Sequence, residues 1–85
     1  MAVLLTYDVA TRQSEVKAAL QSKGYSDKWS QNGLIIHLPS TTLWKSNESP
    51  SGALADIRLV ANVLRVRLLR CITVEFSSTN GTPGE

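Results

Sequence analysis

The chain has 85 residues, a formal net charge of +2, and hydrophobic and charged fractions of 42% and 19%. That length allows one domain and excludes two, and the composition excludes a chain that is disordered throughout. Cys71 is the only cysteine, which excludes a disulfide within the chain and a cysteine-based zinc cluster. Because the N-terminus shows no signal-peptide pattern and no apolar run is long enough to span a membrane, we expect a cytoplasmic protein.

The N-terminal quarter of the chain predicts a strand followed by a helix. The β-rich apolar run at residues 2–7 predicts a central strand, which Asp8 closes. Apolar residues then recur at helical spacing and predict a helix over 12–23. Thr11 is the candidate N-cap of this helix, and Gly24 is its candidate C-terminal stop.

The middle of the chain predicts a hairpin. The sequence Gln31-Asn32-Gly33 is a strong turn signal between an arm at 25–30 and a second arm at 34–38. We expect the second arm to continue irregularly through 39–44. Pro39 cannot donate to a regular central ladder, so an edge or a bulge is expected there.

The last part of the chain predicts a helix, a strand and a tail. Ser49 and Pro50 form a favourable N-cap and first-turn pair, followed by an apolar stripe that predicts a helix over 50–64. Residues 68–76 predict the last strand. The small, polar tail at 77–85 is expected to be disordered.

The resulting element order is β-α-β-β-α-β, which is the ferredoxin-like pattern. It predicts an α+β fold in a single domain at 1–76, with both helices on one face of a four-stranded antiparallel sheet. The first and last strands carry apolar residues on both faces, so the open face would expose an apolar patch. A two-fold homodimer through that face or a sheet edge would bury it. Alternatively, loops or the segment around Trp44 cover it within one chain.

Asp8 and His37 are the candidates for acid–base or metal chemistry. Asp8 can contribute one carboxylate to Mg²⁺, and a symmetric dimer could bring two copies together for phosphodiester cleavage. The simpler interpretation is that Asp8 caps a turn or the start of the first helix. His37, the only histidine, is a candidate general acid or base toward RNA, although a lone histidine in a strand is more often structural.

Hydroxyl-bearing and aromatic residues are candidates for binding nucleic acid. The run Ser40-Thr41-Thr42 follows a proline and offers hydroxyls either to a phosphate or to backbone groups at an irregular strand end. The aromatic residues of the hairpin region can stack on bases or pack on one another across the hairpin. They are Tyr25, Trp29 and Trp44.

Arg65, Arg67 and Arg70 form the densest basic group, with Arg58 nearby. They follow the second predicted helix, where positive charges stabilise the C-terminal end of the helix. They are equally suited to bind the phosphate backbone of a nucleic acid. The sequence contains no P-loop, dinucleotide-binding glycine motif, HExxH motif or nucleophile elbow. An ordinary nucleotide-driven or covalent enzyme is therefore not expected.

The start of the chain, VLLTYDV at residues 3–9, resembles the opening strand of the small CRISPR-associated adaptation endoribonucleases and the virulence-associated protein D toxins. The resemblance implies a ferredoxin-like homodimer whose Asp8, preceded by Tyr7, serves Mg²⁺-dependent phosphodiester cleavage. It also implies a scaffold role in holding DNA. The segment 38–44 departs from the CRISPR-associated members and indicates a separate branch.

Three functions remain in competition after the sequence alone. The first is a metal-dependent endonuclease, toxin-like and acting on RNA more than DNA, with paired Asp8 carboxylates. The second is a non-catalytic nucleic-acid-binding or scaffold dimer that uses Arg65, Arg67 and Arg70. The third is a protein-interaction module that uses a sheet edge or the 39–44 segment.

Overall fold

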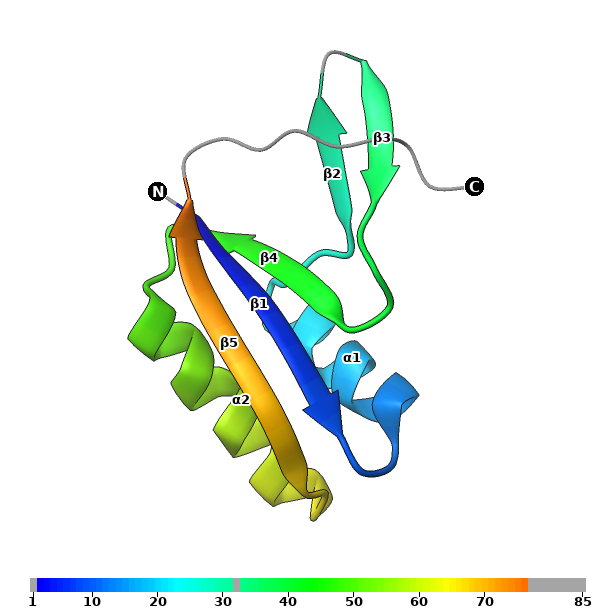
Figure 1. Ribbon diagram of the computed structural model, residues 1–85, viewed down its shortest axis with the longest axis vertical. Coiled ribbons are helices and arrows are strands. Elements are labelled where there is room, and N and C mark those ends of the chain that lie inside the picture. The colour runs from blue at the N-terminus through cyan, green and yellow to red at the C-terminus, as the bar shows by residue number, and fades with distance from the viewer. Residues whose placement is uncertain (1, 32, 77–85) are drawn as a thin grey trace.

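The computed structural model describes residues 2–31 and 33–76, and the tail predicted at 77–85 lies outside the described residues. Figure 1 shows the elements along this part of the chain: β1 (Ala2–Val9), α1 (Gln13–Ser22), β2 (Lys28–Gln31), β3 (Leu34–His37), β4 (Thr42–Ser46), α2 (Pro50–Leu64) and β5 (Leu68–Phe76). Both helices lie on one face of the sheet that contains β1, and the β2–β3 hairpin projects beyond one end of it. Among these residues, no helix is long and apolar enough to cross a membrane.

The strands of the described residues form two sheets. β1 is the central strand of a three-stranded antiparallel sheet with the order β4-β1-β5, and β2 pairs with β3 in a separate antiparallel hairpin. One isolated bridge between Ser26 and Trp44 connects the start of the hairpin to β4. The α+β class, the central first strand and the two helices on one face are confirmed. The prediction of a single four-stranded sheet is wrong for the described residues, which form five strands in two sheets.

The two sides of β1 differ in what covers them. Alternate side chains point toward the helices and are buried: Val3, Leu5, Tyr7 and Val9. They form the core with Val16 and Leu20 of α1 and Ile57 of α2. Leu4, Thr6 and Asp8 lie on the other, open face. The strand continues through Asp8 to Val9, so Asp8 is a strand residue and not the residue that closes the strand.

The two helices begin differently. Ser49 caps α2 as predicted, because its Oγ accepts a hydrogen bond from the Gly52 N–H at 3.0 Å. The prediction that Thr11 caps α1 is wrong: the N-cap position is Arg12, with a φ of 58° and no side-chain cap. The chain turns from β1 into α1 through this left-handed residue, a conformation that β-branched threonine strongly disfavours.

The second arm of the predicted hairpin is in fact two strands. β3 ends at His37, and a turn closed by the Thr42 N–H on the Pro39 carbonyl at 2.9 Å precedes β4. Pro39 has no N–H to continue the ladder. In β4, Leu43 is fully buried opposite Leu5, and burying it joins β4 to the main sheet.

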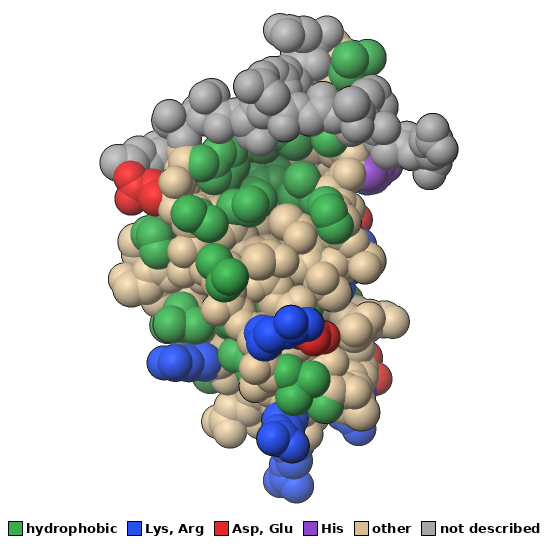
Figure 2. Space-filling model, in the orientation of Figure 1, with side chains coloured by type: hydrophobic (Ala, Val, Ile, Leu, Met, Phe, Trp, Pro, Cys, Tyr) green, Lys and Arg blue, Asp and Glu red, His purple; other side chains and the backbone are tan. Residues whose placement is uncertain are grey.

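The open face is partly covered by the hairpin. Trp29 of β2 packs on Trp44 at 4.6 Å and on Phe76 at 5.2 Å between ring centroids. Hydrophobic side chains gather over the end of the sheet nearest the hairpin in Figure 2. On β5, however, Ile72 remains 63% exposed and Val74 remains 49% exposed. The hairpin therefore covers the end of the open face that carries the aromatic residues, but it leaves the apolar side chains in the middle of β5 exposed.

Candidate functional site

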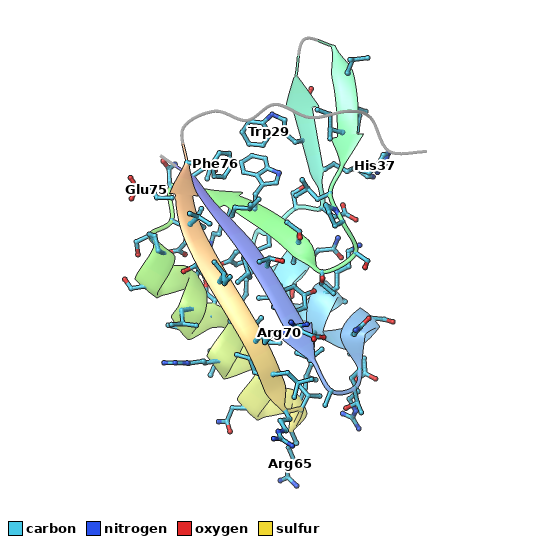
Figure 3. The ribbon with its side chains drawn as sticks, viewed as in Figure 1. Trp29, His37, Arg65, Arg70, Glu75 and Phe76 are labelled. Carbon is cyan, nitrogen blue, oxygen red and sulfur yellow. The ribbon has the colours of Figure 1, made fainter. Side chains whose placement is uncertain are left out.

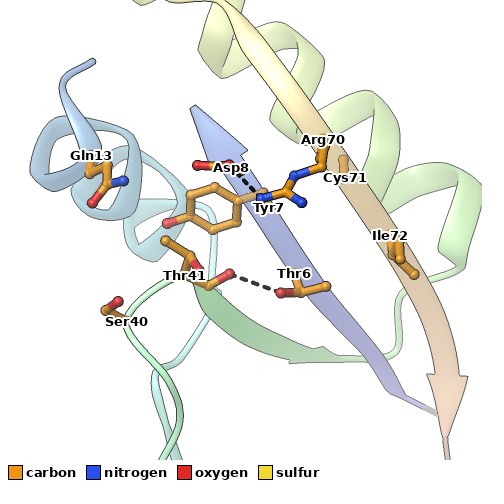
Figure 4. A pocket seen from close by; sticks show the side chains of 9 residues that line it. All are labelled: Thr6, Tyr7, Asp8, Gln13, Ser40, Thr41, Arg70, Cys71 and Ile72. Carbon is orange, nitrogen blue, oxygen red and sulfur yellow. Dashed lines mark hydrogen bonds and ion pairs between the residues drawn. The ribbon is translucent and has the colours of Figure 1, made fainter. Parts of the chain in front are cut away.

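A hollow lies where β1 runs past the end of β4. The last β1–β4 pair is Thr6 with Thr42, followed by a hydrogen bond from the Tyr7 N–H to the Thr41 carbonyl at 3.0 Å, whereas β5 accompanies β1 to Val9. The hollow has a volume of about 460 Å³. Its lining comes from β1, β5, the first residue of α1 and the turn before β4: Thr6, Tyr7, Asp8, Gln13, Ser40, Thr41, Arg70, Cys71 and Ile72 (Figure 4).

Asp8 and Arg70 form a cross-strand ion pair at this hollow. They are register partners in the β1–β5 ladder, which places both side chains on the open face, and Arg70 Nη2 lies 2.9 Å from Asp8 Oδ2. The Arg70 side chain is 82% exposed and that of Asp8 is 35% exposed. Because the pair is so exposed, it contributes at most about 1 kcal/mol to the free energy of unfolding. A guanidinium has five N–H donors, so Arg70 can also bind a second acceptor.

Hydroxyl groups fix the turn against β1. Thr6 Oγ1 donates to the Thr41 carbonyl at 3.4 Å and lies 3.2 Å from Thr42 Oγ1. These contacts support the structural interpretation of Thr42, which helps to hold the strand end. Thr41 and Ser40, in contrast, line the hollow.

The beginning of α1 also faces the hollow, because Gln13 is both its first residue and part of the lining. Its first N–H groups receive no side-chain cap, and the start of a helix carries a partial positive charge. This end of α1 and the Arg70 guanidinium bring positive charge to the hollow, which Asp8 in the lining and Glu15 in the first turn of α1 offset in part.

Tyr7 and Cys71 do not supply a nucleophile or base here. Tyr7 is buried in the core, and burial raises the pKa of its phenol. Burial also raises the pKa of the Cys71 thiol, with Arg58 opposing that shift in part. Both groups are therefore neutral near pH 7, and Tyr7 acts as a packing residue.

The remaining predicted site residues lie elsewhere. Figure 3 shows His37 on the hairpin, far from Arg70, and Arg65 at the opposite end of the molecule. Arg65 is the left-handed C-cap of α2, and Arg67 lies exposed just before β5. Arg12 joins this end, because its Nη1 donates to the Leu64 carbonyl at 3.2 Å. The predicted basic group is thus divided between the end of α2 and the Arg70 hollow.

The aromatic residues have separate roles. Tyr25 is buried and its hydroxyl donates to Asp56 Oδ2 at 2.8 Å, so it is a core residue. Trp29 packs on Trp44 and on Phe76, and the sequence interpretation did not identify Phe76. These three rings border a second, largely apolar hollow of about 250 Å³ on the open face.

The described residues of one chain do not fit a resident Mg²⁺ ion. They contain no group of three or more His, Cys, Asp or Glu side chains that could hold a metal. Asp8, the predicted metal ligand, is already paired with a guanidinium. A metal site at Asp8 would therefore need ligands from outside the described part of this chain.

Four residues that line the first hollow were not predicted as site residues: Thr6, Gln13, Cys71 and Ile72. Thr6 could have been found, because it lies two residues before Asp8 in a strand and so shares its face. Gln13 could not have been found, because its place depends on how α1 docks on the sheet.

A scan against protein-family models, a search of curated proteins and a search of solved structures each found no match to this chain. The family suggested by residues 3–9 therefore rests on the sequence resemblance alone.

Proposed function

We propose that this protein is a ferredoxin-like homodimer that binds the phosphate backbone of a single-stranded nucleic acid, RNA rather than DNA, at the Asp8–Arg70 hollow. The observation that carries the proposal is an exposed guanidinium, Arg70, held beside the uncapped start of α1 and the hydroxyls of Ser40 and Thr41. The preference for RNA is based on the resemblance of residues 3–9 to the opening strand of the CRISPR-associated adaptation endoribonucleases. A cytoplasmic location, where RNA is present and a lone thiol stays reduced, belongs to the same proposal.

In this site Arg70 is the main phosphate ligand. A guanidinium can hold two phosphate oxygens with parallel N–H donors, and the neighbouring hydroxyls can donate to the same group or contact a ribose 2′-OH. Asp8 has two opposing effects. It orients the Arg70 guanidinium through the 2.9 Å contact, and its charge repels a bound phosphate. Binding should therefore be of moderate strength and sensitive to salt.

The ferredoxin-like assignment is supported by the strand order and by the bridge at Ser26. That bridge lies on the side of β4 away from β1, where a fourth strand would extend the sheet. Dimerisation is supported by the exposed apolar residues of β5, which has a neighbour on only one side among the described residues. Because the hairpin obstructs one end of the open face, pairing through the β5 edges fits better than stacking of two faces.

A metal-dependent endonuclease is the second candidate, favoured by the position of Asp8 at an exposed hollow on β1. It requires two Asp8 carboxylates close enough to share one cation. In an edge-paired dimer three strand spacings separate the two β1 strands, so their Asp8 residues lie at least about 14 Å apart. Only a face-to-face dimer would meet the requirement.

Binding of a fluorescein-labelled oligoribonucleotide to wild type, Arg70→Gln and Asp8→Asn tests the proposal. Arg70→Gln should weaken binding and lower the slope of log K against log salt by about 0.7 per lost phosphate contact. Asp8→Asn should strengthen binding, because it removes the repulsive charge and frees the guanidinium. Lys23→Gln, which removes the same charge from an exposed position at the end of α1, should leave the slope unchanged.

Asp27→Asn is the matched control for Asp8→Asn. Asp27 Oδ2 also contacts a cation at 2.9 Å, Lys17 Nζ, and that hydrogen bond lowers the pKa of Asp27. Equal binding by Arg70→Gln and wild type would reject the proposed site. Mg²⁺-dependent cleavage that is lost in Asp8→Asn and retained in Asp27→Asn would establish the nuclease in its place.

A further inference from the structure

The second hollow on the open face has walls made mainly of aromatic rings and aliphatic side chains. Trp29, Trp44 and Phe76 come from β2, β4 and β5, and Leu4, Leu38 and Val74 complete the apolar lining. Trp29 meets Trp44 edge to face with 68° between ring planes and is tilted by 53° from Phe76. None of the recorded ring pairs is a parallel stack, and the three rings line a hollow of about 250 Å³.

The walls are held in place by a hydrogen bond, and their one charged residue, Glu75, points away from the rings. The Trp44 indole N–H donates to the Lys28 carbonyl at 2.6 Å, which ties the ring to the base of the hairpin. Glu75 belongs to the lining, but it is the register partner of buried Val3 and its side chain points away from Trp29 and Phe76 (Figure 3). A neutral planar ligand therefore suits these walls better than an ion does.

The two hollows lie on the same face of the same strand. Leu4 is opposite Trp44 and Val74 in the sheet, and Asp8 is opposite Arg70. Four residues of an extended strand separate these rows, a distance of about 13 Å. The row between them consists of Thr6, Thr42 and Ile72, which carry no charge. A short single strand can follow β1 from one hollow to the other.

We infer that the Trp29–Trp44–Phe76 hollow is a base-stacking site for the same single-stranded nucleic acid whose phosphate contacts Arg70. The inference rests on the proposed function, because Arg70 supplies the charge that brings the strand to this face. Aromatic stacking accepts every base, so the site discriminates single strands from duplexes rather than one sequence from another.

The test compares two RNAs of equal length, about eight nucleotides: an oligoadenylate and an abasic RNA with the same number of phosphates. Dissociation constants are measured by fluorescence anisotropy, and quenching of tryptophan emission is recorded in parallel. We expect the abasic RNA to bind about tenfold more weakly and to leave the emission unchanged. Trp29→Leu should reduce oligoadenylate binding by a similar factor without affecting the abasic RNA.

Val63→Thr is the matched control for Trp29→Leu, because Val63 is an exposed apolar residue on α2, on the other side of the sheet. Equal affinity of the wild-type protein for the two RNAs would overturn the base site and leave the Arg70 site standing. The wild-type comparison does not depend on how Trp29→Leu folds. The opposite outcome is that Arg70→Gln binds oligoadenylate and the abasic RNA as tightly as wild type does, while oligoadenylate still quenches tryptophan emission. That result would reject the phosphate site and retain the base site.

Discussion

Tyr25 shows how the fold changes the chemistry of a single side chain. The ring is buried against the core, with Lys45 Nζ 5.4 Å from its centroid, and its hydroxyl donates to Asp56 Oδ2 of α2. Burial, and secondly the hydrogen bond to Asp56, raise the pKa of Tyr25 well above its usual value. A residue that the sequence offered as a base-stacking candidate is therefore a structural link between the hairpin region and α2.

Replacing Tyr25 by Phe should lower the free energy of unfolding at pH 7 by about 1 kcal/mol, because one hydrogen bond is lost. The unfolded tyrosine ionises above about pH 10, whereas the folded one stays protonated, so wild-type stability should fall as the pH rises past that point. The fall should be shallower in the variant. Urea unfolding between pH 7 and 11 measures both effects. Identical pH profiles would contradict the raised pKa of Tyr25, and equal stability at pH 7 would contradict the contribution of its hydrogen bond.

At the scale of elements, the caps explain why one helix follows its predicted bounds more closely than the other. α2 begins where Ser49 and Pro50 place it and ends at Leu64 as predicted. α1 is one residue shorter at each end than its prediction, begins without a side-chain cap and depends on packing of Val16 and Leu20. Local signals therefore determine α2 and also the end of α1, where Gly24 has the predicted role with a φ of 101°, whereas the core and the turn from β1 determine the start of α1.

Ser49→Ala should destabilise the protein by about 1 kcal/mol, since the Gly52 N–H loses its acceptor at the start of α2. The shift should appear as a lower urea midpoint with an unchanged slope. Ser14→Ala, in the exposed first turn of α1, should change stability by less than about 0.5 kcal/mol. Equal effects of the two substitutions would show that the Ser49 cap contributes nothing of its own.

At the scale of the whole molecule, β5 has a strand neighbour on only one side within residues 2–31 and 33–76, and it exposes apolar side chains. Ile72 is the central residue of this strand, so a symmetric antiparallel pairing of two β5 strands places two copies of Ile72 opposite each other. Such pairing would bury apolar surface that one chain leaves in water.

Ile72→Lys should therefore weaken the homodimer by at least about tenfold, because two ammonium groups would lie face to face. Val63→Lys changes an equally exposed aliphatic residue on α2, 70% exposed, and should leave the association unchanged. Sedimentation equilibrium of both variants and wild type measures the difference. A wild-type protein that remains monomeric at all concentrations would remove the dimer from the proposed function.

The sequence by itself determined the type and place of most elements. Residues 68–76 and 50–64 match β5 and α2, and Gly33 lies between β2 and β3 at a φ of 79°. These features depend on local chemistry: apolar periodicity, a capping serine and a glycine where the turn needs a positive φ. Asp8 was found for the same reason, since it stands at the end of an apolar run.

Only the tertiary structure decided which residues meet. Asp8 and Arg70 are 62 positions apart and became partners through the β1–β5 register, while Arg65 and Arg67 went to the other end of the molecule. Likewise, the break at Pro39 let β4 join β1 and placed Trp44 against Trp29, which also contacts Phe76 of β5. Register and docking depend on burying Leu43, Leu5 and their neighbours together, which is a property of the whole core and not of any segment.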